Sequence, residues 1–228
     1  MKMLGAITLI LSVFAVFYGF FIANSHSRSV NYLCQLSADG NIAALKRMVI
    51  SRDFVNKFGT ANADCCREGS NPSPSPALHF AVVCKRTAVT KYLIAHGADV
   101  NSRGDGGLTP LMWANDAQTV DVLVSSGASM EARDANGMTA LMHAVAEHNI
   151  DVMNSIVKHG ATIDAIDQSG RTALMMAVDG RLDDILAKPL ISHGANPDKK
   201  DHEGNSARTI ASQQNNRAVL ADLDSLKM

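Results

Sequence analysis

The chain has 228 residues, of which 46% are hydrophobic and 5% are aromatic, and its formal net charge is −1. A charge balance so close to zero argues against nucleic acid or an anionic lipid surface as the partner. The hydrophobic share is that of a globular protein with a core. The few aromatic residues favour small helical units packed through Ala, Leu, Val and Met.

The N-terminal segment is the first compositional break. Lys2 is followed by an uncharged stretch from Met3 to Ala23. The basic start, the apolar middle and the site Ala23-Asn24-Ser25 match a secretory signal peptide, but the stretch is also long enough for a transmembrane helix. We therefore expect residues 1–25 to be either a cleaved signal peptide or a retained anchor. Both place the rest of the chain outside the cytoplasm, in the periplasm of a bacterium or its equivalent. If residues 3–23 are retained, they anchor the chain in the inner membrane.

All four cysteines lie in the first third of the chain, at Cys34, Cys65, Cys66 and Cys84. An even number of cysteines in an exported protein permits disulfides. We expect Cys65 or Cys66 to pair with Cys84 or Cys34, and reduced thiols are the alternative. The adjacent pair lacks the C-x₂-C spacing of a zinc site.

Two short motifs recur along the chain at a common interval. A Gly-Ala pair begins at Gly97, Gly127, Gly160 and Gly194. The second motif occupies Pro76–His79, Thr109–Met112, Thr139–Met142 and Thr172–Met175. The two motifs advance together, which identifies an internal repeat.

One repeat contains two helices and a turn. Thr139 can cap a first helix, in which Leu141 and Ala144 share one face. A second helix follows and ends at Gly160, in the role that glycine commonly takes after a helix. An extended turn from Asp164 to Gly170 then leads to the next repeat.

The second motif, at a period near 33, resembles the T-P-L-H-x-A signature of ankyrin repeats. The histidine of that signature is present only at His79 and is replaced by Met112, Met142 and Met175. Methionine can fill the same volume by packing. The resemblance implies an all-α ankyrin-repeat solenoid of about six helix-turn-helix units with hairpin tips, preceded by the N-terminal apolar helix.

The expected ankyrin-repeat domain covers residues 30–226. Its units are expected at residues 30–55, 76–101, 109–132, 139–164, 172–198 and 206–226. An inserted loop at 56–75 separates the first two units, and the third unit is about three residues short after its first helix.

Nothing in the sequence marks a catalytic or metal centre. The motifs G-x-S-x-G, H-E-x-x-H and G-x-x-x-x-G-K-[ST] do not occur. His96, His159 and His193 each precede a capping glycine and lie at least one repeat apart, too far from one another to share a metal ion. We expect a protein that is not an enzyme and holds no metal and no cofactor.

The ankyrin resemblance implies that another protein binds at the hairpin tips and at the exposed side of the first helices. The matching positions here are Asp105, Leu108, Arg133, Met138, Glu147, Arg171, His202 and Glu203. Leu108 and Met138 are expected to be exposed apolar anchors, and scattered surface hydrophobes are the alternative reading.

The size and layout of the chain resemble those of exported bacterial ankyrin proteins that serve as immunity proteins. Such a protein binds and neutralises a secreted toxin, for example a lipase effector. The alternative hypothesis is a periplasmic stress-protection or enzyme-support factor.

Overall fold

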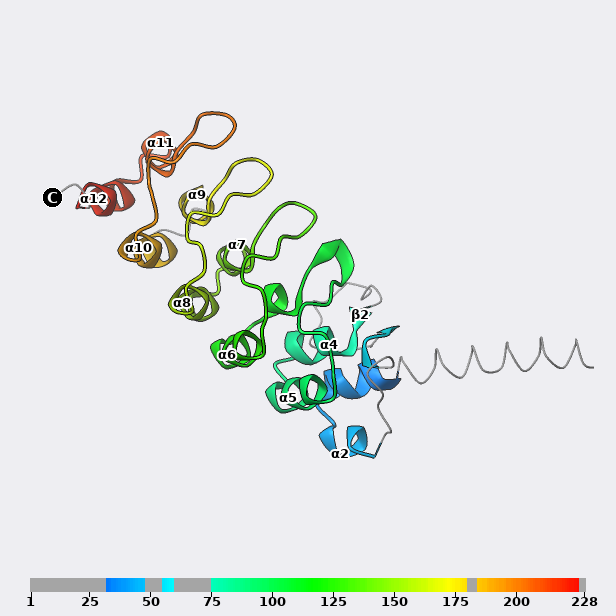
Figure 1. Ribbon diagram of the computed structural model, residues 1–228. Coiled ribbons are helices and arrows are strands. Elements are labelled where there is room, and N and C mark those ends of the chain that lie inside the picture. The colour runs from blue at the N-terminus through cyan, green and yellow to red at the C-terminus, as the bar shows by residue number, and fades with distance from the viewer. Residues whose placement is uncertain (1–31, 48–54, 60–74, 180–183, 226–228) are drawn as a thin grey trace, which may run out of the picture.

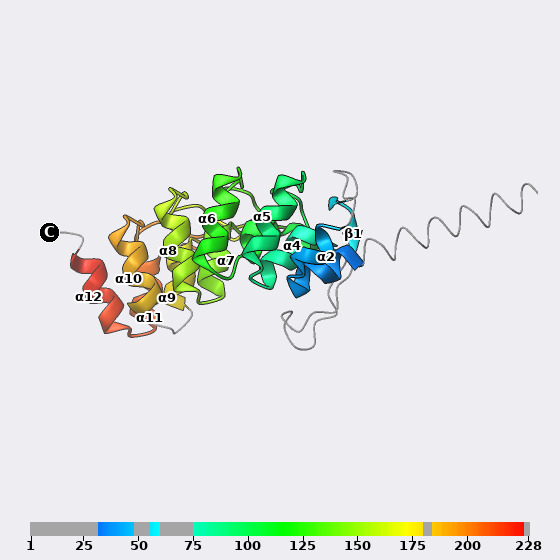
Figure 2. The same ribbon diagram turned by 90° about the horizontal axis from the view of Figure 1, so that it is seen from below.

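The computed structural model describes residues 32–47, 55–59, 75–179 and 184–225. The N-terminal segment 1–25, Cys65, Cys66 and most of the predicted insertion lie outside these residues. The described helices stack as pairs along one axis that ends at the C-terminus (Figures 1 and 2). The predicted all-α solenoid of helix-turn-helix units is confirmed.

The helices form two layers, and the hairpins project from one side of the stack (Figure 1). The first helices of the units are residues 32–39, α4 (Ala77–Val83), η2 (Pro110–Trp113), α7 (Ala140–Ala146), α9 (Ala173–Asp179) and α11 (Ala207–Gln213). The second helices are α2 (Ile42–Leu45), α5 (Thr87–Ala95), α6 (Ala117–Ser125), α8 (Ile150–Lys158), α10 (Asp184–Ser192) and α12 (Arg217–Ser225). The first helices, nearer the hairpins, are called the inner layer, and the second helices the outer layer.

Local sequence explains where the helices begin and end. The side chains of Asp116 and Asn149 accept the backbone N–H of the third residue beyond them and so cap α6 and α8. Gly160 follows α8 with φ +89°, a conformation that glycine adopts without strain. Between the layers, aliphatic and methionine side chains such as Leu141, Met142 and Ile156 are buried almost completely.

The third unit departs from the others in its inner helix. The inner helices α4, α7, α9 and α11 each have seven residues, whereas η2 is a single 3-10 turn of four. The sequence predicts that residues are missing after the first helix, whereas the structure shows that the first helix itself is shortened to this 3-10 turn. Pro110, at the first position of the turn, has no N–H to lose there.

A short antiparallel ladder closes the base of the insertion. β1 (Phe58–Gly59) pairs with β2 (Ser75–Pro76), with Phe58 opposite Pro76. The buried thiol of Cys34 lies 3.6 Å from the carbonyl oxygen of Ser75. Cys84, at the end of α4, is disulfide-bonded. The predicted pairing with Cys65 or Cys66 stays a prediction, because these two residues lie outside the described ranges.

His79 is buried beneath the hairpin of the third unit, and its surroundings explain why its pKa is lowered. Its Nε2 lies 3.1 Å from the carbonyl oxygen of Leu108, and among the described residues its Nδ1 has no hydrogen-bond partner. In the third and fifth units, the methionine at this position accepts the backbone N–H of the threonine three residues earlier. The second unit has Pro76 there, which has no N–H to offer. Burial lowers the pKa of His79, although the hydrogen bond to Leu108 opposes this effect.

We predict that His79 makes the fold sensitive to mild acid. Its pKa is lowered in the folded state, so the unfolded chain binds the proton more readily. The free energy of unfolding should therefore decrease as pH falls below about 6.5, by up to about 1.4 kcal/mol per pH unit. His79→Met, which copies Met112 and Met142, should remove this component. Denaturant unfolding between pH 7.5 and 5, roughly the range in which an imidazole titrates, measures the difference; parallel curves for the two proteins would contradict the prediction.

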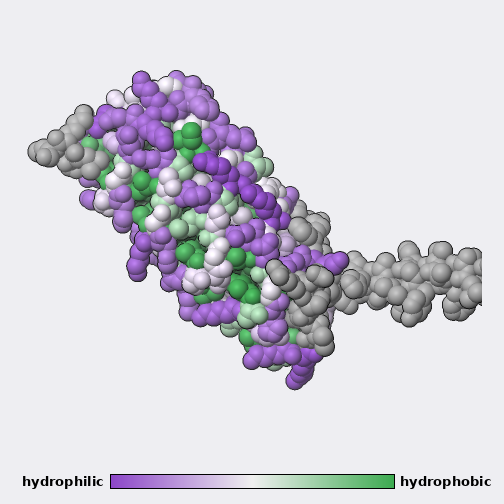
Figure 3. Space-filling view, viewed as in Figure 1, coloured by the Kyte–Doolittle hydropathy of each residue, from purple (hydrophilic) through white to green (hydrophobic). Residues whose placement is uncertain are grey.

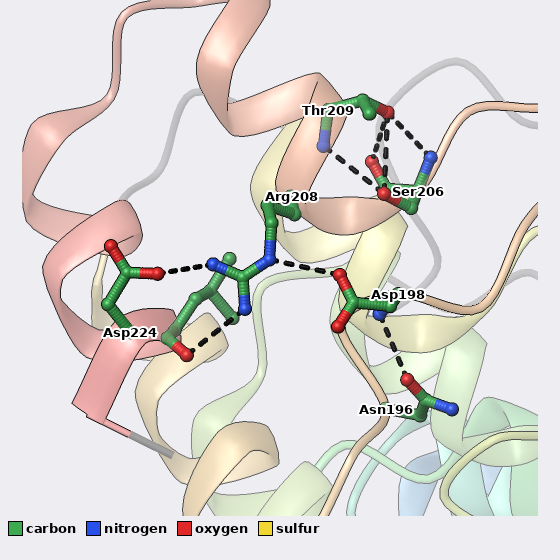
Figure 4. Close-up of polar contacts among 7 residues, drawn as sticks. Asn196, Asp198, Ser206, Arg208, Thr209 and Asp224 are labelled. Carbon is green, nitrogen blue, oxygen red and sulfur yellow. Dashed lines mark hydrogen bonds and ion pairs between the residues drawn. The ribbon is translucent and has the colours of Figure 1, made fainter. Parts of the chain in front are cut away.

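Arg208 connects the last inner helix to the chain on both sides of it (Figure 4). Its Nε lies 2.9 Å from Asp198 Oδ1, its Nη1 lies 2.5 Å from Asp224 Oδ1, and its Nη2 donates to the carbonyl of Leu223 at 3.3 Å. The hydrogen bond to Asp198 is the main cause of the raised pKa of Arg208. One guanidinium thus joins the incoming loop, α11 and α12.

We predict that Arg208→Met loosens α12 more than it lowers the stability of the whole domain. The terminal helix has a neighbouring unit on one side only, and exposed ion pairs contribute about 0–1 kcal/mol each. Amide hydrogen exchange should therefore accelerate in α12 while remaining unchanged in α7. Arg217→Met, on the exposed start of α12, is the matched control. Equal exchange in α12 for the Arg208 variant and the native chain would refute this role.

Candidate protein-interaction surface

The hairpin tips of the last four units form one continuous ridge, which we call the hairpin ridge (residues 103–108, 133–138, 166–171 and 200–205). Each of the last three tips donates a backbone N–H to the tip before it. The bonds run from Ala135 to Gly106, from Gln168 to Asn136 and from His202 to Ser169, at 2.9–3.0 Å. The hairpins follow one another along one side of the stack (Figure 1), and these backbone bonds link each of them to the next.

An aspartate organises each of the last three tips. Oδ1 of Asp134 accepts the backbone N–H groups of Asn136 and Met138, both at 2.8 Å. Asp167 and Asp201 make the same pair of bonds in the next two units. The third unit has Gly104 at this position because a Cβ there would lie 3.1–3.2 Å from Ser75 Oγ and the His79 ring.

Two arginines clip neighbouring tips together. Nη1 of Arg103 donates to the carbonyl of Gly107 in its own tip at 3.0 Å and to that of Arg133 in the next tip at 2.6 Å. Nη1 of Arg133 likewise donates to Gly137 and Ile166. Arg133, predicted as a partner-binding residue, thus also has a structural role. Arg103 was not predicted, although aligning the repeats places it opposite Arg133.

Comparison with protein families identifies the architecture. The family model described as ankyrin repeats (3 copies) matches residues 21–134 and 115–201. The chain belongs to the ankyrin-repeat family. Ankyrin repeats form protein–protein interaction modules, and the family is typically non-catalytic.

Besides Arg133, which is also exposed, four of the eight predicted partner-binding residues lie on the surface of the ankyrin domain as polar, exposed side chains. These residues are Asp105, Glu147, His202 and Glu203. Glu147 lies at the end of α7, and the other three lie on hairpin tips. The ring of His202 packs over Gly170 of the preceding tip, since a Cβ on that glycine would lie 2.7 Å from it. The ridge therefore presents a carboxylate at one end, on Asp105, and an imidazole and a carboxylate at the other, on His202 and Glu203.

Leu108 and Met138 are not the exposed anchors that the sequence predicts. Both side chains are only partly exposed and pack against the hydrophobic core of the repeats. Each lies on the returning arm of its hairpin, directly before a threonine that is 2% exposed. The returning arm therefore directs these side chains toward the interior, and their contact with a partner stays a prediction.

Arg171 is half-buried and already paired. Its Nη2 lies 2.8 Å from Oδ2 of Asp179, at the other end of α9. Oδ1 of Asp179 accepts a hydrogen bond from Gln214 of the next unit at 3.1 Å. The guanidinium therefore belongs to a polar chain that crosses from the fifth ankyrin unit to the sixth.

Trp113 is a surface residue that the sequence prediction did not include. It is 39% exposed, and its position in η2 matches Phe80, His143 and Met176 in the neighbouring units. Phe80 is only 4% exposed, so the indole is more open than the ring one unit earlier. On the face drawn in Figure 3, hydrophobic residues form small patches among hydrophilic ones. A single exposed tryptophan among such residues is a candidate anchor.

The remaining polar clusters connect neighbouring elements. His143 Nε2 lies 2.9 Å from Oδ2 of Asp134, and His159 Nε2 lies 2.8 Å from Oδ1 of Asp121. The bond from His159 lowers the pKa of Asp121. Across the described ranges, no three His, Cys, Asp or Glu residues are grouped as metal ligands would be. In the same part of the chain, no helix has the length and apolarity needed to span a bilayer.

Proposed function

We propose that this ankyrin protein acts outside the cytoplasm as a non-catalytic binding protein, and that its hairpin ridge and Trp113 contact the partner. The observation that carries the proposal is the rigid ridge, whose tips are linked by backbone bonds and arginine clips. Such a surface loses little conformational freedom on binding. Trp113 adds a residue type that is enriched among binding hot spots.

The extracytoplasmic part of the proposal rests on the N-terminal sequence. Lys2 followed by the uncharged segment Met3–Ala23 has the composition of an export signal or an anchor. The disulfide at Cys84 suits an oxidising compartment. We propose neutralisation of a secreted toxin, such as a lipase effector, as the specific role.

The site of action is tested by cell fractionation and by the mass of the mature protein. We predict either removal of the segment that ends at Ser25 or a near neighbour, or retention of residues 3–23 as an anchor. In the second case the repeats should be accessible to protease added to spheroplasts. A full-length chain in the soluble cytoplasm would contradict both versions.

The binding surface is tested with one combined variant, Trp113→Gln, Glu147→Lys and Glu203→Lys. We expect partner capture to weaken by more than about tenfold, which corresponds to about 1.4 kcal/mol. The melting temperature should change little, because Glu147 and Glu203 are exposed and Trp113 is partly so. The control carries Lys91→Glu and Asn154→Lys on the exposed outer layer and should bind as the native chain does.

The partner is identified by capture from the extracytoplasmic fraction and from the product of the adjacent gene. Inhibition of a captured hydrolase by the native chain, and its release by the combined variant, would support neutralisation. A captured enzyme whose activity is maintained by the chain would instead indicate an enzyme-support factor. Equal capture by the native chain and the combined variant would exclude this surface as the interface.

A further inference from the structure

Arg103 and Arg133 lie on adjacent tips of the hairpin ridge. The contacts that link the tips use only part of each guanidinium. Both side chains are exposed. Each uses Nη1, with its two hydrogens, for two backbone carbonyls. Within the described residues, neither Nε nor Nη2 of these arginines makes a hydrogen bond. The edge formed by Nε and Nη2 is the one that binds a carboxylate through two parallel hydrogen bonds.

The clip also fixes the orientation of each guanidinium. A surface arginine normally loses considerable side-chain freedom when it binds a partner. Here two carbonyl contacts hold Nη1 before any partner arrives, so less freedom remains to be lost. Lysine could occupy the same position, as Lys200 does in the last unit, but it has no planar fork.

The carboxylates nearest in sequence are engaged elsewhere. Asp134 is 4% exposed, and its two oxygens serve its own tip and His143. Oε1 of Glu131 accepts the backbone N–H of Thr162 at 2.7 Å. Asp105 is exposed, and its Oδ1 accepts the N–H of Gly106. Neither Asp134 nor Glu131 forms an ion pair with either arginine in the described part of the chain.

We propose that Arg103 and Arg133 together bind two carboxylates of an acidic segment in the protein partner. The inference rests on the proposed function, and it specifies the chemistry of the segment that the ridge takes. Adjacent packed helices lie about 8–10 Å apart, and three residues of polyproline II chain make one turn and span about 9 Å, so side chains three residues apart share a face. A segment in this conformation with acidic residues at positions i and i+3 therefore reaches both forks. The next tip does not extend this row of arginines, because it has Ile166 at the same position.

The test uses a synthetic peptide with the full-length protein in detergent micelles. The probe is acetyl-Asp-Ser-Ser-Asp-amide, and the matched control is acetyl-Asn-Ser-Ser-Asn-amide. Nuclear magnetic resonance of the arginine Nε–Hε groups reports the titration residue by residue. We expect saturable shifts at Arg103 and Arg133 with the acidic peptide only. The signal of Arg217, on the exposed start of α12, should not saturate.

Substitutions distinguish binding through the two parallel donors of arginine from binding through positive charge alone. Arg103→Lys and Arg133→Lys keep the charge and should weaken peptide binding by at least about fivefold, because the bidentate contact is lost. Arg217→Lys should bind as the native chain does. If a lysine variant melts lower, Arg103→Gln, which keeps amide donors for the carbonyls, replaces it. Equal affinity in the native chain and the folded Arg103 and Arg133 variants would overturn the proposal.

Three other outcomes would also contradict the proposal. If inorganic phosphate or phosphatidylglycerol vesicles bind more strongly than the peptide at equal charge, the ligand is a phosphate group rather than a carboxylate. This result would overturn the proposal. The absence of saturable shifts at both arginines would also overturn it. If partner capture depends on Trp113 and Glu147 but is unaffected by the two lysine substitutions, the proposed function stands and this inference fails.

Discussion

Backbone hydrogen bonds between successive hairpins fix the position of each hairpin tip relative to its neighbour. A single unit buries too little surface to be stable alone, so each must pair with its neighbours. The helices do so by apolar packing, whereas the exposed hairpins do so through the N–H groups of Ala135, Gln168 and His202. Because these bonds set the position of one tip against the next, they also set the position of the side chains on the hairpin ridge.

The irregular features of the molecule cluster around the second and third units, and they depend on one another. Pro76 ends the ladder at the base of the insertion and leaves a nitrogen of His79 without a donor. The ring of His79 in turn lies close to the next hairpin, where a Cβ on Gly104 would lie 3.2 Å from it. The following inner helix is reduced to one turn, where Trp113 is left partly exposed.

The repeat pattern was sufficient to predict the fold, but it was not sufficient to predict the interaction surface. The period locates helices and tips because capping, glycine and apolar positions are local properties of the chain. Exposure depends on neighbouring units, which explains why Leu108 and Met138 were wrongly expected to be exposed. The clip made by Arg133 could not be predicted either, since one of its acceptors is a carbonyl 33 residues away. Trp113 could have been found by comparing it with His143 in the aligned repeats.

Arg103 and Arg133 both stabilise the ridge and offer donors to a partner. A single substitution can therefore change both roles at once. Truncating Arg103 or Arg133 to alanine would remove two carbonyl contacts together with the outward edge. Any loss of binding could then come from a loosened tip rather than from a missing fork. Replacements that keep a donor toward the carbonyls alter the outward edge with less disturbance of the tip. Comparing lysine with arginine therefore tests recognition, whereas alanine would test recognition and rigidity together.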